Sequence, residues 1–162
     1  LLGETHDEMG GGEYFKSLGA IGNSVPKVNL EKNLKTYLAL EKVIEKELVS
    51  SSLSVTSGGL AVALAKACVG GNIGCKVAID KVCGSPTSAD IKLFSESQGR
   101  ILVSISPKNT KEFEKVFSRI SYTKIGKVEN GGKVIVTDGK NKVVETNVKK
   151  LTTIYHKFSN SQ

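Results

Sequence analysis

Apolar residues recur every three or four positions over long parts of this chain and every second position over shorter parts. The first period is typical of amphipathic helices and the second of strands. The pattern predicts helices over residues 13–18, 30–49, 58–69, 110–118 and 147–158. It predicts strands over residues 53–56, 74–79, 101–105, 122–128, 133–137 and 142–145. We therefore expect an α+β fold that combines helices, a mixed sheet and hairpins.

Two of these helices differ in how their apolar residues are distributed. The first follows Asn29, a good N-cap residue, and its apolar positions fall on one face, which we expect to pack inward. These positions are Leu30, Leu34, Tyr37, Leu38, Ile44 and Leu48. The helix over 58–69 is apolar on nearly all sides except Lys66, which predicts a centrally packed element.

Length and charge exclude several classes of protein. The chain has 162 residues and a formal net charge of +7, the size of a single domain, and we expect one domain over residues 1–162. Only Arg100 and Arg119 are arginines among 23 basic residues, and the lysines are scattered, which is typical of a solvated surface and not of a nucleic-acid interface. No apolar run approaches the ~20 residues of a membrane span. Because the chain begins with Leu1, we expect a piece of a longer polypeptide.

The cysteines and histidines indicate neither a disulfide framework nor a metal site. Cys68, Cys75 and Cys83 are odd in number, lack CxxC spacing and have no histidine near them. This usage favours a reducing compartment, and we expect a cytoplasmic protein. His6 is either a ligand contact or an ordinary surface-loop histidine.

Two glycine-rich segments are the candidate binding residues. Glycine adopts positive φ and lets backbone N–H groups approach an anion, and a helix N-terminus adds a partial positive charge. The alternative is that both segments are plain turns. The phosphate- or nucleotide-binding candidates are Gly10, Gly11, Gly12, Ser57, Gly58 and Gly59.

Charged residues beside these segments are candidates for supporting the loops. Glu96 and Arg100 flank a short turn, either as a surface pair of little energetic value or as a link that holds a loop edge. Asp7, Glu8 and Glu13 either contribute a ligand or orient the first glycine segment, or they are solvated loop carboxylates. The sequence has no phosphate loop, no dinucleotide fingerprint and no Ser-His-Asp or Cys-His motif, so we assign no catalytic residue and no metal ligand.

Three stretches, in order and spacing, resemble one known domain. They read Leu2-Gly3-Glu4-Thr5 with Asp7-Glu8-Met9-Gly10-Gly11 and Glu13-Tyr14, then Ser57-Gly58-Gly59-Leu60-Ala61-Val62-Ala63-Leu64-Ala65, then Leu93-Phe94-Ser95-Glu96-Ser97 with Gly99-Arg100. These stretches are similar to the sequence of the C-terminal, AIR synthase-related domain in the last half of the large subunit of phosphoribosylformylglycinamidine synthase. The resemblance runs from residue 1 to about 158.

The resemblance implies a three-layer α/β/α fold that is partly ferredoxin-like, and a role in purine biosynthesis. Enzymes of this family convert formylglycinamide ribonucleotide and glutamine-derived ammonia to the amidine with ATP and magnesium. ATP lies mainly on other domains of the chain, so this domain would need no cofactor of its own. Its partners would be the upstream domains, a glutaminase and small accessory subunits, with neither nucleic acid nor membrane.

One departure from the family pattern removes ionisable groups. Where the family reads His-Asp-Val-Ser-Asp-Gly-Gly-Leu, this chain reads Leu53-Ser54-Val55-Thr56-Ser57-Gly58-Gly59-Leu60. The glycines remain, whereas the histidine and both aspartates are absent. The favoured hypothesis is a cleft wall and assembly surface of the ligase, inactive in isolation. The alternatives are a noncatalytic module of the same fold, or a relative such as AIR synthase, selenophosphate synthetase or thiamine-phosphate kinase.

Overall fold

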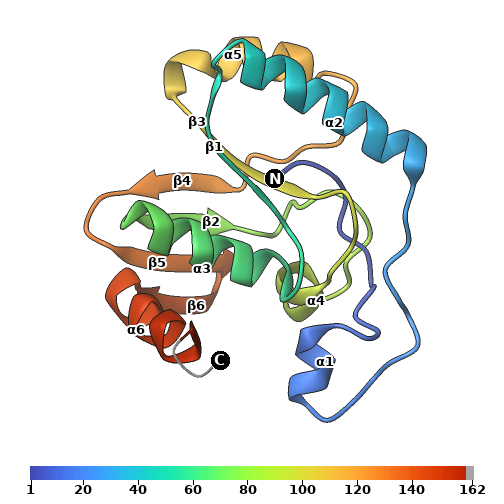
Figure 1. Cartoon of the computed structure of the whole chain (residues 1–162), viewed down its shortest axis with the longest axis vertical. Helices are drawn as coiled ribbons and strands as arrows, with labels where there is room; N and C mark the ends of the chain where they lie inside the picture. The colour runs from blue at the N-terminus through green and yellow to red at the C-terminus, as the bar shows by residue number, and fades with distance from the viewer. Residues whose placement is uncertain (160–162) are drawn as a thin grey trace. The chain divides into compact units, whose positions relative to one another are not determined.

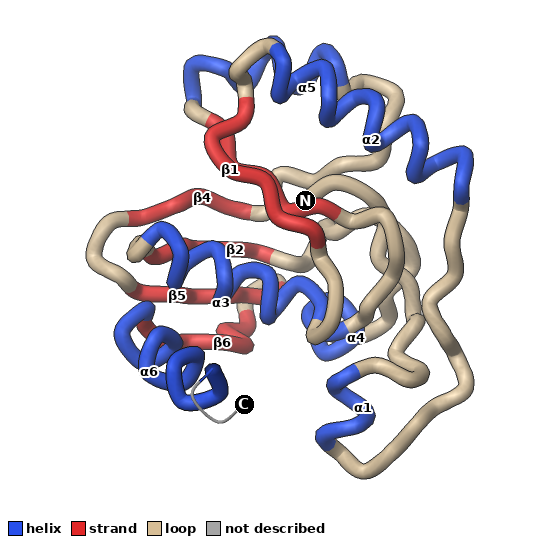
Figure 2. Tube along the Cα trace, in the orientation of Figure 1, coloured by secondary structure: helices blue, strands red, loops and turns tan. Residues whose placement is uncertain are grey.

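The computed structural model describes residues 1–159, and the last three residues of the expected single domain, 160–162, lie outside the described part. Contacts between Cα atoms divide the chain into two compact units. The first unit comprises Leu1–Ala63 and Val82–Lys124, and the second comprises Leu64–Lys81 and Ile125–Gln162. Figure 1 labels the elements of both units, and Figure 2 distinguishes helices, strands and loops.

The first unit is built from helices and one two-stranded ribbon. Strands β1 and β3 pair antiparallel, with Leu53 opposite Leu102. Helices α2 and α5 lie side by side in Figure 1 and contact each other. The elements of this unit are α1 (Glu13–Ser17), α2 (Leu30–Glu45), β1 (Val49–Ser54), α4 (Ala89–Phe94), β3 (Ile101–Ile105), the 3-10 turn η1 (Pro107–Asn109) and α5 (Thr110–Val116).

An apolar core holds the first unit together. Phe113 and Phe117 stack with ring centroids 4.7 Å apart, and Tyr122 meets both rings edge-on. Burial of such aromatic side chains is the largest favourable contribution available to a unit of this size. The core residues are Leu2, Ala39, Val43, Leu48, Ile101, Phe113 and Phe117.

The second unit is a four-stranded mixed sheet in the order β4-β2-β5-β6. Strands β2 and β5 are parallel, and the two outer pairs are antiparallel. Alternate residues of β5 are buried, including Val134 and Val136. The strands are β2 (Gly74–Ala78), β4 (Gly126–Glu129), β5 (Lys133–Asp138) and β6 (Asn141–Asn147), followed by helix α6 (Val148–Ser159). Helix α3 (Gly59–Gly71) begins in the first unit and ends in the second.

The α+β class expected from the apolar pattern is confirmed. The strand over 101–105 and the hairpin at Asp138 and Gly139 lie where the sequence predicts them. Asn29 caps α2 as predicted, because its side chain accepts the N–H of Lys32 at 3.0 Å. None of the described helices is long and apolar enough to cross a membrane.

Several boundaries and one helix face differ from the prediction. The helix predicted over 30–49 ends at Glu45, and β1 begins at Val49 instead of residue 53. The strand predicted over 122–128 is limited to Gly126–Glu129, and α4 has no counterpart in the prediction. Of the residues predicted to pack inward, Leu48 is buried, but it lies beyond the end of α2. Those within α2 are exposed, and the buried residues of the helix are Thr36, Ala39 and Val43.

Candidate functional site

Arg100 anchors the segment that carries Glu96. Its guanidinium is 1% exposed and donates from Nε to the Ser97 carbonyl at 3.0 Å. It also donates to the Ser95 carbonyl and, at 3.1 Å, to the Thr5 hydroxyl. Burial lowers the pKa of Arg100 to about 10, and the charges of Glu8 and Glu96 act in the opposite direction. Of the two alternatives for Glu96 and Arg100, the surface pair does not fit, because Arg100 is buried against the turn and the N-terminal segment.

The carboxylate of Glu96 joins the two glycine-rich segments. One oxygen, Oε1, accepts the backbone N–H of Glu13 at 2.9 Å and the backbone N–H of Gly58 at 2.9 Å. Hydrogen bonds to an ionised acceptor are roughly twice as strong as neutral ones. The structure thus brings together two segments separated in the sequence by more than forty residues, and it places an anionic group of the chain itself between them.

The backbone N–H groups expected to be free are bonded within the chain. Gly10 donates to the Ser24 carbonyl at 2.7 Å, Gly11 to Ile21 at 2.8 Å and Gly12 to Met9 at 3.2 Å. Gly59 donates to the Thr56 carbonyl at 2.9 Å. The expectation of clustered unpaired donors is wrong at these positions, because the loops close on their own carbonyls.

Close backbone packing explains why glycine stands at position 10. A Cβ there would lie 2.8 Å from both the carbonyl carbon and the carbonyl oxygen of Ser24, closer than real Cβ contacts. The Ser24 hydroxyl in turn donates to the Asp7 carbonyl at 2.5 Å. The first glycine segment is therefore packed tightly onto residues 21–24, which no local pattern in the sequence predicts.

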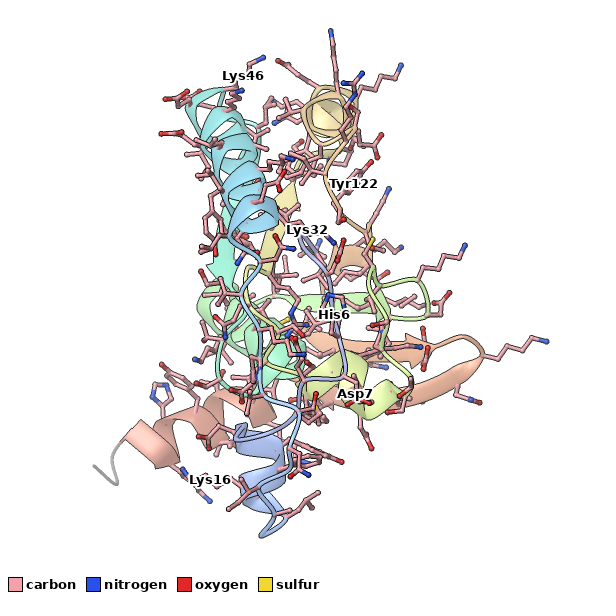
Figure 3. All side chains as sticks on the ribbon, turned by 90° about the vertical axis from the view of Figure 1, so that its right-hand side faces the viewer. His6, Asp7, Lys16, Lys32, Lys46 and Tyr122 are labelled. Carbon is pink, nitrogen blue, oxygen red and sulfur yellow. The ribbon has the colours of Figure 1, made fainter. Side chains whose placement is uncertain are left out.

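The remaining predicted residues lie at the edge of this arrangement. Asp7 and Ser57 are exposed, and the Glu13 carboxylate forms an exposed pair with Lys16 at 3.5 Å. Figure 3 shows Asp7 and Lys16 on the side of the chain that carries the first glycine segment. The same unit contains a pocket of about 270 Å³, which His6 and Glu8 line but the other predicted site residues do not.

Sequence reasoning assigned no role to Ser95 and Ser97, and it placed Glu8 among the loop carboxylates without predicting its burial. Glu8 is 7% exposed, and the hydroxyls of Ser95 and Ser97 are buried and 3.0 Å apart. The sequence does carry one signal for this polar core. Arg100 is one of only two arginines, and arginine is favoured over lysine where a side chain makes several hydrogen bonds in a fixed position.

The described residues contain no group of three or more histidine, cysteine or carboxylate side chains that could hold a metal ion. The contacts that the structure gives the Glu96 carboxylate are hydrogen bonds from the backbone N–H groups of Glu13 and Gly58. Such an arrangement fixes two loops against each other and can present a rigid surface to a neighbouring domain.

A family model described as AIR synthase related protein, C-terminal domain, matches residues 1–139. A curated relative, phosphoribosylformylglycinamidine synthase subunit PurL of Methanocaldococcus jannaschii, is 37% identical over 158 residues. The match covers 96% of this chain and 21% of that protein, so the chain spans about a fifth of the relative's length. The family match and the relative both span the two glycine-rich segments.

Solved structures give the same fold. Thermotoga maritima PurL complexed with FGAR superposes with a TM-score of 0.80 at 22% identity, over 93% of this chain and 27% of that one. T. maritima PurL complexed with ATP gives a TM-score of 0.70 at 20% identity, over 93% and 24%. The T. maritima PurLQS structure gives 0.69 at 23% identity, over 78% and 22%.

Proposed function

We propose that this chain, which belongs to the family of AIR synthase related protein C-terminal domains, works as the C-terminal domain of a phosphoribosylformylglycinamidine synthase. The observation that carries the proposal is the match of nearly the whole chain, at 37% identity, to a synthase subunit about five times as long. The other domains of such a polypeptide would hold the nucleotide and the reacting groups.

The proposed reaction is the ATP-dependent conversion of formylglycinamide ribonucleotide and glutamine-derived ammonia to the amidine. ATP and magnesium would belong to the full-length enzyme, and this domain would require neither alone. The T. maritima structures solved with FGAR, with ATP and as PurLQS support this reaction, its nucleotide, and a glutaminase and a small accessory subunit as partners. The cytoplasm is the proposed compartment.

Within that enzyme, the domain would form a wall of the reaction cleft. Two observations support a structural role for the glycine segments Gly10, Gly11, Gly12 and Ser57, Gly58, Gly59. The Glu96 carboxylate fills the position between them, and the N–H groups of Gly10, Gly11, Gly12, Gly58 and Gly59 have acceptors within the chain. A phosphate placed between the two segments would therefore meet the Glu96 carboxylate and N–H groups that already have acceptors.

The test is a chimeric synthase in which this chain replaces the matching region of the M. jannaschii subunit. With ATP, magnesium, ammonia and formylglycinamide ribonucleotide, we expect turnover by the chimera and none by the isolated chain. Glu96→Ala in the chimera should lower kcat/KM by about 10- to 100-fold, because the two loops lose their common acceptor and shift. Glu112→Ala is the matched control, since this carboxylate is exposed and its ion pair is with Lys46 on the surface.

Turnover by the isolated chain would contradict the proposal that this domain is inactive without the other domains of the synthase. Full activity of the Glu96→Ala chimera would contradict the role of the bridged loops. A folded chimera without activity would favour the second candidate, a noncatalytic module of the same fold. That candidate is supported by residues 50–65, which carry no ionisable side chain.

A large exposed apolar surface supports the assembly role. It extends from the segment before α2 along the outer face of that helix, and side chains such as Ile21 and Leu30 are 78% and 79% exposed. On α2 itself the exposed apolar residues recur at spacings of three, four or seven positions and so share one helix face, and an exposed apolar face favours an interaction site. We propose that the rest of the synthase covers it. Its members are Leu18, Ile21, Val25, Val28, Leu30, Leu34, Tyr37, Leu38 and Ile44.

Substitutions on the two faces of α2 should have opposite consequences. Leu34→Lys should change the free energy of unfolding of the isolated chain by less than about 0.5 kcal/mol, because the side chain is solvated. The same change should impair assembly of the chimera, seen as lost activity. Val43→Ala, at a fully buried position, should cost about 2 kcal/mol. Urea denaturation of both variants measures the difference, and a large loss for Leu34→Lys would instead place that face in the core.

A further inference from the structure

A polar pocket lies in the first unit, apart from the glycine segments. Its volume is about 270 Å³, and it is formed by the N-terminal segment, the beginning of α2, the turn after Glu96 and the segment after α5. Figure 3 views this side of the chain, with Lys32 above His6. Its lining includes the titratable residues Glu4, His6, Glu8, Lys27, Lys32 and Arg119.

One acidic group of the pocket is fully engaged. Glu4 Oε2 accepts the ammonium of Lys32 at 2.8 Å and lies 3.4 Å from His6 Nε2. Its other oxygen accepts the Ser121 hydroxyl at 2.8 Å. The hydrogen bonds from Lys32 and Ser121 hold the pKa of Glu4 below its usual value. Glu4 is therefore an ionised part of the wall, and both of its oxygens already have donors within the chain.

The second acidic group is only half engaged. Glu8 is 7% exposed, so it is more than nine-tenths buried. Its Oε1 accepts the backbone N–H of Lys27 at 3.2 Å. Its Oε2 is buried and has no hydrogen-bond donor among the described residues. A buried carboxylate oxygen in native proteins is normally hydrogen-bonded, so this atom calls for a donor from outside the chain.

Positive charge is available in the same pocket. Lys27 and Arg119 line the pocket, and within the described residues neither side chain has an ion-pair partner. A guanidinium presents a planar fork of donors that suits phosphate and carboxylate groups. The pocket therefore offers both spare donors for an anion and one spare acceptor for a hydroxyl or amino group.

We propose that this pocket binds a small organic anion that carries an adjacent hydroxyl or amino group. Its anionic group pairs with Arg119 and Lys27, and its hydroxyl or amino group donates to Glu8 Oε2. An anion without a hydrogen-bond donor leaves Glu8 Oε2 unpaired, and a simple cation is repelled by the basic side chains. An apolar molecule pairs with neither Oε2 nor the basic side chains. The site is independent of the synthase activity proposed above.

Matched pairs of small probes test the proposal on the full chain. Glycerol 3-phosphate is compared with propyl phosphate, and glycerate with propionate, by amide chemical shifts in a titration. In at least one pair we expect the hydroxylated member to bind at least fivefold more tightly, with shifts confined to the pocket segments. The pair that shows the preference distinguishes a phosphate ligand from a carboxylate ligand.

Two variants locate the contacts. Arg119→Gln should weaken binding of the preferred probe at least fivefold, whereas Lys111→Gln, an exposed lysine on α5 outside the pocket, should leave it unchanged. Glu8→Gln should reduce the preference for the hydroxylated probe towards one. If Glu8→Gln does not fold, Arg119→Gln and the probe pairs still test whether the pocket binds such an anion. Equal binding within both pairs, or no effect of Arg119→Gln, overturns the proposal.

Discussion

Replacing Arg100 with methionine is expected to lower the free energy of unfolding by about 3–5 kcal/mol, the range found when one member of a buried charge cluster is removed. The guanidinium is 1% exposed and donates to Thr5, Ser95 and Ser97. Methionine fills similar volume but leaves these acceptors without donors. It also leaves the charges of Glu8 and Glu96, which now favour the ionised guanidinium, without a buried counterion.

Arg119 provides the matched control, as the other arginine of the chain and an exposed residue. Arg119→Met should change the unfolding free energy by no more than about 0.5 kcal/mol. Guanidinium chloride denaturation of the two variants beside the parent chain measures both effects. Equal losses would show that the buried hydrogen bonds of Arg100 do not hold the turn at residues 95–97.

The sequence predicts those elements whose signals are local. The strand at 101–105 is an apolar run closed by Pro107, and the hairpin at Asp138 and Gly139 carries the dipeptide typical of a tight turn. The N-cap at Asn29 is likewise a local signal. These features depend on neighbouring residues alone, so the apolar pattern and turn chemistry are sufficient to predict them.

The orientation of α2 could not be predicted in this way. A helix with a single apolar face is normally assigned to the core, but periodicity does not distinguish a core from a partner surface. Here the small residues Thr36 and Ala39 face inward, and the larger Leu34 and Leu38 face out. The prediction failed because the apolar face of α2 is not covered by the chain itself.

The candidate site was predictable in its membership but not in its chemistry. The resemblance brought both glycine segments and Glu96 together as one group of residues. Glu96 Oε1, the atom that joins them, bonds to residues 38 and 83 positions away in the sequence, which no local pattern specifies. Burial of Arg100 and Glu8 also runs against the general preference of these residue types for the surface. Long-range polar contacts of this kind need the structure.

Gly59→Ala is expected to destabilise the chain by at least about 3 kcal/mol, because two costs combine at this position. The residue has φ +66°, a conformation that costs an L-residue roughly 1–2 kcal/mol. A Cβ would also lie 2.6 Å from the Leu93 carbonyl oxygen and 2.7 Å from that of Ser95. Both are backbone atoms at the end of α4, so relief requires moving α3 or the segment that carries Glu96.

Gly11→Ala separates the two costs. Gly11 has φ +70°, and no atom lies within 4 Å of the position that its Cβ would take. This variant should therefore lose only about 1–2 kcal/mol, from the backbone conformation alone. Urea denaturation of both variants, with circular dichroism to follow the helices, gives the difference that belongs to the contact with α4. A Gly59→Ala loss equal to that of Gly11→Ala would show that α3 does not begin against the Leu93 and Ser95 carbonyls, and would remove the packing on which the bridge from Glu96 to Gly58 depends.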